Sequence, residues 1–384
     1  MYLRRVTINT KGTLAMSNYI MVACDLHDKT MVLLIARNRE TGVRRKFAND
    51  PEGRRLMIQD LRRRSKAAGG AEVVFAYEAS GEGFGLHDEL TDAGIRCHVL
   101  APIHIPRSAK HRASKNDQRD AKAILVLLRG HLLAGNELPT VWIPDHATRD
   151  DRELVRARLD AAVKLAKVKN QITSLLKRHR LRRPASSGKG WTQTYVSWLQ
   201  SLARKQGSAK NPLGPGARAA LRSLLRQMES QEKEVADLEK AVVALSATPR
   251  YAKPAEAVIA LKGVGAVTAM VFLTEIGDLR RFRNRRQLAS YLGLVPRSNE
   301  SGEANDRKGH INRQGPSRIR KVVNQAVWSA IRDDPELAAA YGRIVRKHPK
   351  QKKIAVVAAM RRLSVVMWHR GLDALGPPPG REAA

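Results

Sequence analysis

YIMVACDL, residues Tyr19 to Leu26, is an apolar run whose next-to-last residue is the acid Asp25. Buried strands have this length and this β-branched and aromatic content. Two further strands are predicted at Lys29 to Arg37 and at Gly42 to Phe47, and only short polar breaks separate the three runs. Breaks this short predict an antiparallel meander.

The chain then alternates between helical and strand patterns. Asp50-Pro51 is a typical helix start, and the helix is expected to run to about Lys66. Strands at 71–77 and 95–100 enclose a helix at 83–93, and another helix is expected at 116–131. A meander followed by alternating helices and strands predicts an α/β domain with a mixed sheet.

The composition is strongly basic. The 384 residues include 70 Lys and Arg against 36 Asp and Glu, which gives a formal net charge of +34. A charge of one sign on this scale favours a polyanionic partner. The basic residues spread over the whole chain rather than over one amphipathic helix, so nucleic acid is favoured over an anionic membrane.

The cysteines and the apolar runs favour a cytoplasmic protein. Cys24 and Cys97 both lie in strand-like runs and are expected to be buried free thiols. The longest apolar run near the C-terminus, Ile354 to Met360, is too short to span a bilayer, and no signal peptide is visible. We therefore expect a cytoplasmic protein that associates with the nucleoid when it acts, with no membrane partner.

The middle of the chain is predicted to be helical. One helix is expected at about 149–180 and a second at about 218–245. The second places apolar residues on a heptad seam, with Gln231 as its polar exception; the seam comprises Leu221, Leu224, Met228, Val235, Leu238, Val242 and Leu245. This spacing favours a coiled-coil hairpin or a dimerising arm, and two ordinary bundle helices are the alternative.

Between these helices lies a segment rich in Lys, Arg, Gly, Ser and Pro, residues 180–216. It is expected to form an irregular tip. It also contains Trp191, Tyr195 and Trp198. Aromatic residues among basic ones suit RNA or single-stranded DNA, and a plain solvated linker is an equal alternative.

Four carboxylates stand out by their positions. Asp25 and Glu78 each come at the end of a predicted strand, and Asp117 and Asp120 lie three apart at the start of a helix, on one face. Four acids that converge repel one another unless cations bind between them. Mg²⁺ takes oxygen ligands from carboxylates and from substrate phosphates, and Mn²⁺ is a possible substitute. Taken singly, each acid is more often a turn former or a helix N-terminal residue.

Other residues fit contacts to nucleic acid. In and just after the polar loop at 297–310, the cations that could clamp a phosphate are Arg297, Arg307, Lys308 and Arg313. Ser301 and Ser298 are equally attractive hydroxyls there. Gly263 and Gly265 lie in a turn between helical patterns, where they suit either a phosphate site or a tight helix–helix turn. Arg112 and Lys115 belong to the basic loop at 106–115.

These motifs resemble the DEDD insertion-sequence transposases. The resemblance is carried by Asp25 after its strand, by Glu78-Ala-Ser-Gly81 and by Lys115-Asn-Asp-Gln-Arg-Asp-Ala121. It continues in four C-terminal motifs and so spans about 19–370: Leu261 to Ala269, Glu275 to Asp278, Tyr291 to Arg297, and Glu300-Ser-Gly302. The family often has Thr before the first acid of the paired motif, where this chain has Asn116. The middle segment also looks long.

The resemblance implies a DNA recombinase that is guided by a structured noncoding RNA and works as a homo-oligomer, a dimer or, in synapsis, a tetramer. It implies that Asp25, Glu78, Asp117 and Asp120 bind the metal and that Ser301 is the nucleophile. A hydrolytic Holliday-junction-type nuclease that uses the acids alone, or a nonenzymatic nucleic-acid-binding protein, are the alternatives, but neither gives Ser301 a role.

The expected parts follow in chain order. They are a disordered basic extension at 1–16, an RNase H-like (RuvC-like) domain at 17–145, a coiled-coil hairpin with a basic tip at 146–250, a helical transposase domain at 251–373 and a disordered tail at 374–384.

Overall fold

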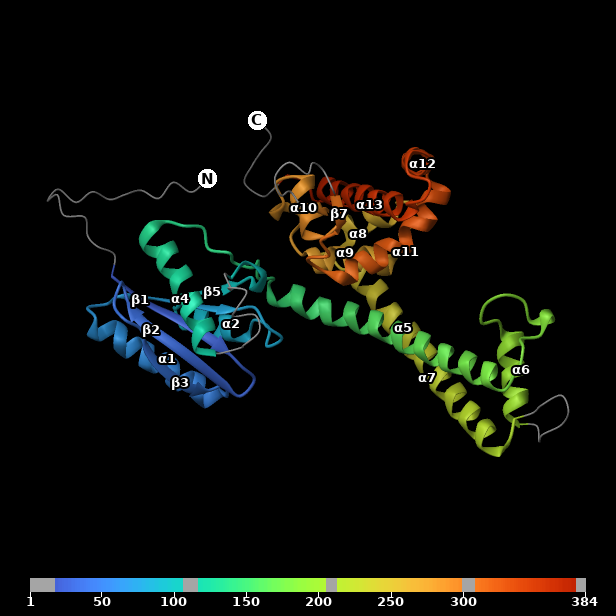
Figure 1. Cartoon of the computed structure of the whole chain (residues 1–384), viewed down its shortest axis with the longest axis horizontal. Helices are drawn as coiled ribbons and strands as arrows, with labels where there is room; N and C mark the ends of the chain where they lie inside the picture. The colour runs from blue at the N-terminus through green and yellow to red at the C-terminus, as the bar shows by residue number, and fades with distance from the viewer. Residues whose placement is uncertain (1–17, 106–116, 205–212, 299–307, 378–384) are drawn as a thin grey trace. The chain divides into compact units, whose positions relative to one another are not determined.

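The computed structural model describes residues 18–105, 117–204, 213–298 and 308–377, and only the backbone at 117–120, 297–298 and 308–309. The chain divides into two compact units, Met1–Ile143 and Pro144–Ala384 (Figure 1). The expected N-terminal extension, and the tail from residue 378 on, lie outside the described residues.

The first unit is built on a five-stranded sheet in the order β3-β2-β1-β4-β5. Its strands are β1 (Tyr19–Leu26), β2 (Thr30–Arg37), β3 (Val43–Ala48), β4 (Glu72–Glu78) and β5 (Arg96–Leu100). β2 pairs antiparallel with both β1 and β3, whereas β4 lies parallel to β1 and β5 parallel to β4. The predicted mixed sheet is confirmed, and it is that of an RNase H-like domain.

Alternation along the strands gives each face of the sheet its own helices. Val22 and Cys24 pack in one core with α1 (Pro51–Ala67) and α2 (Gly85–Asp92). Met21 and Ala23 point the other way and pack against α4 (Asp117–Ala134). At the start of α1 the Asp50 carboxylate accepts a hydrogen bond from the Gly53 N–H at 2.7 Å, which satisfies one free donor of the first turn. A short 3-10 turn, η1 (Pro102–His104), follows β5.

The second unit begins with a long helical hairpin made of α5 (His146–Arg178) and α7 (Pro215–Ser246), which pack against each other (Figure 1). The seam residues Leu221, Met228 and Val242 are buried. Two ion pairs fix the antiparallel register: Arg158 to Glu239 at 2.6 Å and Lys169 to Glu232 at 2.7 Å.

The tip of this hairpin differs from the expected irregular segment. It contains a 3-10 turn, η2 (Ala185–Ser187), and a helix, α6 (Gln193–Arg204). Tyr195, Leu199 and Leu202 recur at helical spacing and are buried against α5 and α7. Tyr195 is therefore a core residue, and the Arg183 guanidinium lies over its ring, 4.0 Å from the centroid. The buried ring is not available to stack on a nucleic-acid base.

A compact helical bundle completes the second unit. The sequence predicts a polar loop at 297–310, but part of it pairs as a two-stranded ribbon. The sequence of this segment lacks the apolar alternation that would have predicted these strands. The last helix also runs two residues into the expected tail. The elements are α8 (Ala252–Ile259), α9 (Ala266–Ile276), η3 (Leu279–Arg281), α10 (Arg285–Tyr291), β6 (Pro296–Ser298), β7 (Lys308–Ile311), α11 (Ser317–Asp333), α12 (Pro335–Lys347) and α13 (Lys352–Leu375).

None of the described helices combines the length and the apolar content that crossing a bilayer requires. Both cysteines are free thiols, as predicted. Cys24 is buried and Cys97 half-buried, and burial raises the pKa of each thiol.

Candidate catalytic site and nucleic-acid contacts

Two of the predicted acids lie side by side at one edge of the sheet. Cys24 of β1 pairs with Tyr77 of β4, so Asp25 and Glu78 are the next residues on two adjacent parallel strands. Alternation puts both on the face that Ala23 and Ala76 share, which is the face covered by α4. The Asp25 side chain is 16% exposed, and one of its oxygens lies 3.2 Å from Nε2 of His27.

The start of α4 lies at this same edge. Near the other end of the helix, Nε of Arg129 donates to the Asn38 carbonyl at 3.2 Å. Asn38 in turn accepts from the N–H of Tyr19, the first residue of β1. α4 therefore runs antiparallel to β1, and its first turn, which contains Asp117 and Asp120, lies beside the end of β1. The side chains at 117 and 120 lie outside the described residues.

The described side chains at this edge fit a divalent cation in part. Asp25 and Glu78 supply two oxygen donors, and Mg²⁺ is often held by one or two carboxylates together with waters and substrate phosphates. Within the described part of the chain no group of three His, Cys, Asp or Glu side chains is arranged to hold an ion. A complete protein site would need the positions on α4.

Two acids of α2, Asp88 and Glu89, have partners of their own. Nε of Arg54 on α1 binds both oxygens of Glu89, at 2.9 and 2.7 Å. Asp88 lies 3.4 Å from Nδ1 of His87. These contacts give Glu89 a role in holding α1 to α2.

The serine segment is only partly described. Ser301 and Arg307 lie outside the described residues, as do Arg112 and Lys115. Arg297 and Lys308 have described backbones in β6 and β7, the two strands on either side of residues 299–307. Arg313 is exposed and adopts the left-handed conformation, with φ at 54°.

The base of this ribbon is closed by two glycines. Gly293 and Gly315 have φ of +65° and +86°. A Cβ on Gly315 would lie 1.8 Å from the Tyr291 carbonyl oxygen, and one on Gly293 would lie 2.1 Å from that of Gln314. Arg320 of α11 donates to the carbonyls of Leu292 and Gly315 at 3.1 and 3.0 Å. Burial, with the charge of Arg313, lowers the pKa of this guanidinium. No pattern in the sequence marks Arg320 for this role.

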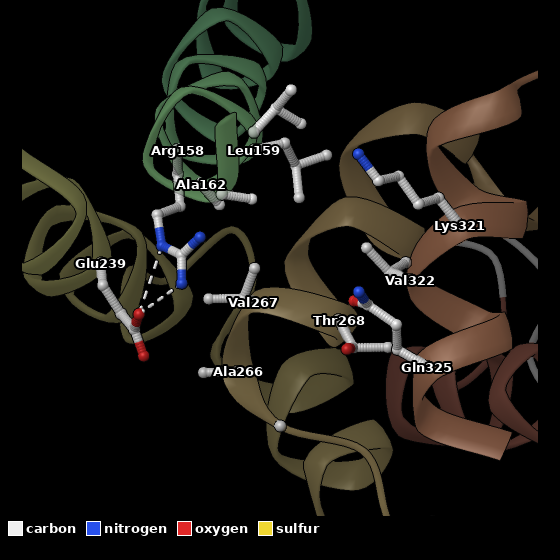
Figure 2. A pocket seen from close by; sticks show the side chains of 13 residues that line it. Arg158, Leu159, Ala162, Glu239, Ala266, Val267, Thr268, Lys321, Val322 and Gln325 are labelled. Atoms are coloured by element: carbon white, nitrogen blue, oxygen red, sulfur yellow. Dashed lines mark hydrogen bonds and ion pairs between the residues drawn. The ribbon is translucent and has the colours of Figure 1, made fainter. Parts of the chain in front are cut away.

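The two predicted glycines of the α8–α9 turn differ in their surroundings. Gly263 has φ at +80°, and a Cβ there would lie 2.6 Å from the Ala330 nitrogen of α11, so this glycine permits a tight turn against that helix. Gly265 is the N-cap of α9 and faces open space. It also lines a pocket of about 390 Å³ between α5, α9 and α11 (Figure 2).

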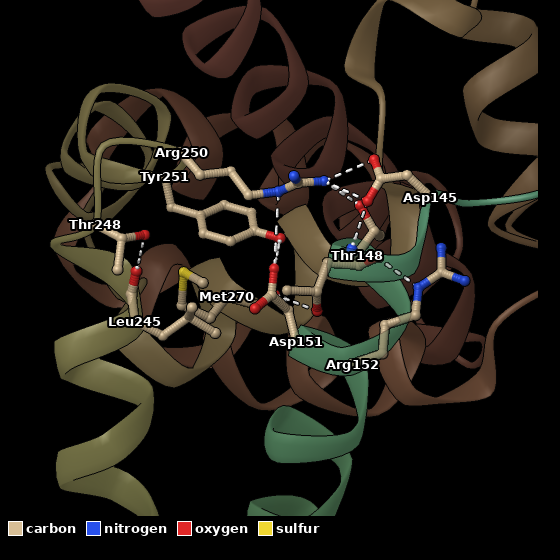
Figure 3. A network of polar contacts seen from close by, with 10 residues as sticks. Asp145, Thr148, Asp151, Arg152, Leu245, Thr248, Arg250, Tyr251 and Met270 are labelled. Atoms are coloured by element: carbon tan, nitrogen blue, oxygen red, sulfur yellow. Dashed lines mark hydrogen bonds and ion pairs between the residues drawn. The ribbon is translucent and has the colours of Figure 1, made fainter.

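A polar network joins the base of the hairpin to the bundle (Figure 3). Arg250 binds both oxygens of Asp145 at 2.8 and 2.7 Å, and the Tyr251 hydroxyl donates to Asp151 at 2.7 Å. Burial raises the pKa of Tyr251, so its hydroxyl stays protonated and donates. Arg152 donates to the carbonyls of Thr274 and Glu275 at 2.7 and 2.9 Å.

Glu275, which belongs to one of the family-like motifs, has a structural partner. Its buried carboxylate binds Nε and Nη2 of Arg156 on α5 at 2.8 and 3.1 Å. The Glu275 carbonyl also accepts from the Tyr291 hydroxyl at 3.0 Å. This motif therefore fixes the hairpin to α9.

Comparison with known proteins agrees with this fold. Residues 22–180 match the DEDD transposases of the IS110 type, and residues 255–342 match the family described as transposase IS116/IS110/IS902. The putative transposase y4qE of Sinorhizobium fredii is 30% identical over 321 residues, which cover 77% of this chain and 74% of that protein. The transposase of insertion sequence IS1111A from Coxiella burnetii is 25% identical over 62% of this chain and 60% of its own length. A pilin gene-inverting protein of Moraxella bovis is 29% identical over 32% of this chain and 38% of its own.

The fold and these matches define a DNA transposase that carries an RNase H-like domain. The chain belongs to the IS110 family of DEDD insertion-sequence transposases. A DEDD domain points to a divalent metal ion.

Proposed function

We propose that this transposase cuts and exchanges DNA strands with a composite site made of the four acids Asp25, Glu78, Asp117 and Asp120 and the nucleophile Ser301. The observation that supports it best is the meeting of three elements at one edge: the ends of β1 and β4 and the first turn of α4. The four acids that the family resemblance implicates belong to these three elements.

In this proposal the Ser301 hydroxyl attacks the phosphorus of a DNA phosphodiester. A new P–O bond forms to the serine oxygen, which gives its proton to solvent, the bond to the departing DNA oxygen breaks, and that oxygen takes up a proton from solvent. Mg²⁺, or Mn²⁺ in its place, would polarise the phosphate and favour the deprotonated serine. The carboxylates hold the ion and Arg297, Arg307, Lys308 and Arg313 orient the phosphate oxygens. Because the acids and the serine belong to separate units, the reaction requires units of one protomer or of two to come together.

The proposal includes a structured noncoding RNA as the guide and a homo-oligomer, a dimer that becomes a tetramer in synapsis, as the active form. Both come from the family resemblance, and the formal net charge of +34 supports a second polyanion besides DNA. The basic loop with Arg112 and Lys115, and the turn with Gly263 and Gly265, are proposed as backbone contacts to these nucleic acids. We also propose that 17–145 and 251–373 are the two catalytic domains, that the hairpin at 146–250 sets the assembly, and that the protein acts at the nucleoid.

Two substitutions test the site with an end-labelled DNA substrate and its guide RNA. Asp25→Asn should abolish strand cleavage, and Ser301→Ala should abolish both cleavage and the covalent protein–DNA adduct that a denaturing gel detects. Both variants should bind nucleic acid as the unchanged protein does, because neither removes a phosphate contact. Ser298→Ala is the matched control and should keep most of the activity.

The outcomes separate transposition by a serine from hydrolysis. Free phosphate ends produced by Ser301→Ala at the native rate would exclude the serine nucleophile and leave a nuclease that uses the acids and water. Recombination by Asp25→Asn at the native rate in Mg²⁺ would exclude the carboxylate site.

A further inference from the structure

α11 exposes one face that the bundle does not cover. Its residues Ile319, Val323 and Val327 are buried against the other helices. Lys321, Gln325 and Trp328 recur on the opposite side at helical spacing and are exposed. The Trp328 side chain is 51% exposed, whereas Trp368 in the same bundle is 4% exposed.

Trp328 packs against a second aromatic ring. The Tyr341 ring of α12 meets it edge to face, with ring centroids 6.3 Å apart and planes at 69°. Such a contact is typical of paired aromatic rings, and it limits the rotation of the indole. An exposed aromatic ring of fixed orientation is suited to stacking on another flat group.

Polar groups lie one to two turns away along the same face. Figure 2 shows Lys321 and Gln325 of α11 with Thr268 of α9 around the pocket of about 390 Å³. Within the described residues Lys321 has no carboxylate partner, whereas Arg158 on the far wall is bound to Glu239 at 2.6 Å. Lys321 is thus the cation that this pocket offers to a ligand.

The surroundings favour an anion. No acid occurs in the sequence from Arg307 to Arg332, which contains the cations Arg307, Lys308, Arg313, Arg318, Arg320, Lys321 and Arg332. The first acid after it, Asp333, is bound by Arg332 at 3.0 Å, and this contact, with the charge of Lys262, lowers the pKa of its carboxyl.

We propose that this face of α11 binds single-stranded DNA, with an unpaired base stacked on Trp328 and the adjoining backbone phosphate at Lys321 and Gln325. The helix rise of about 1.5 Å per residue puts positions 321 and 328 roughly 10 Å apart, a span that a nucleotide and its neighbour can cover. Base faces are available only in an unpaired strand, since in a duplex they are stacked. A transposase acts on DNA and its strand exchange unpairs bases, so this inference rests on the proposed function.

The test measures binding of a fluorescein-labelled oligothymidylate to the full chain, without metal, so that no cleavage is needed. Trp328→Ala should weaken binding roughly tenfold or more, which is the effect of losing one stacked base. Trp328→Phe keeps an aromatic face and should stay within about threefold of the unchanged protein. Lys321→Gln should lower the slope of log affinity against log salt by about 1, because one phosphate contact is lost. Lys240→Gln, at an 81% exposed lysine of α7, is the matched control and should change little.

Three results would overturn the proposal. They are an unchanged affinity of Trp328→Ala for the oligothymidylate, an equal loss for a duplex of the same length, and a loss that appears only with the corresponding oligouridylate. If Trp328→Ala does not fold, tryptophan fluorescence decides: saturating oligothymidylate should quench the unchanged protein more than Trp328→Phe, and equal quenching rejects the site. Binding is independent of Asp25 and Ser301, so failure here leaves the catalytic proposal standing.

Discussion

Gly315 is the residue on which the geometry at the base of the β6–β7 ribbon depends most directly. It adopts a left-handed φ of +86°, and its α-carbon faces the Tyr291 carbonyl so closely that a Cβ would lie 1.8 Å from the oxygen. An alanine here meets both the conformational cost of the left-handed region and a backbone clash. The backbone at residue 315 would have to move away from the Tyr291 carbonyl.

We expect Gly315→Ala to destabilise the second unit by roughly 2–5 kcal/mol and to abolish strand cleavage. Gly190→Ala is the matched control, because Gly190 also has a left-handed φ, +83°, but nothing lies within 4 Å of a Cβ there. It should cost only about 1–2 kcal/mol. Urea denaturation followed by circular dichroism measures both. Equal losses in the two variants would show that the close approach to Tyr291 is unimportant.

At this scale the sequence predicts some residues well and others poorly. The meeting of Asp25 and Glu78 at one sheet edge could be predicted because a strand pattern and its last residue are local, and parallel strand ends meet at one edge. Arg320 and Arg156 could not. Arg156 binds Glu275, which lies 119 residues further along the chain. Arg320 donates to backbone carbonyls, and a backbone carbonyl leaves no trace in the sequence.

At the scale of elements, the hairpin shows how far periodicity alone can be followed. The heptad seam of α7 is used inside the chain, since Leu221 and Val242 are buried where α7 packs on α5. The buried Oε1 of Gln231 has no hydrogen-bond partner among the described residues, which marks the seam's polar exception. Val243, outside the seam, is 48% exposed and lines an apolar groove beside Val235 and Ala244.

Two substitutions on α7 separate folding of the hairpin from assembly of protomers. Leu238→Asp places a charge in the half-buried seam, so it should destabilise the hairpin by about 1–3 kcal/mol and lower the oligomer mass in light scattering. Val243→Asp should lower only the mass, because its side chain already faces solvent. If the mass stays constant in both variants, the seam and the groove serve an intrachain bundle.

The tip shows why a composition-based prediction was wrong at this scale. Lys, Arg, Gly, Ser and Pro dominate 180–216 and suggest an irregular loop. Tyr195, Leu199 and Leu202 nevertheless form a stripe one helical face wide, and it packs on the ends of α5 and α7. Three residues that bury an apolar face are enough to favour a short helix even where most of its flanks are polar.

For the whole molecule, the large positive net charge is the property that most affects binding to other molecules. The formal net charge is +34, and the described ion pairs include local ones, such as Arg55 with Glu52, and long-range ones, such as Arg158 with Glu239. Such pairs offset some cations without removing the excess. Net charge makes no statement about fold, but it governs association with polyanions and its dependence on ionic strength.

We therefore expect the affinity for both DNA and RNA to fall steeply with salt. Each phosphate that a Lys or Arg neutralises releases bound counterions, and a protein with 6–10 such contacts loses about 10³–10⁵ in affinity between 50 and 200 mM salt. Titrations across that range, with the intact chain and a labelled duplex or RNA, give the slope of log affinity against log salt. Ser301→Ala is the control and should reproduce the native slope, because a neutral hydroxyl contributes no counterion release. Affinity that stays flat across the range would contradict the polyanion interpretation of the charge, since then uncharged contacts to bases or sugars would dominate binding.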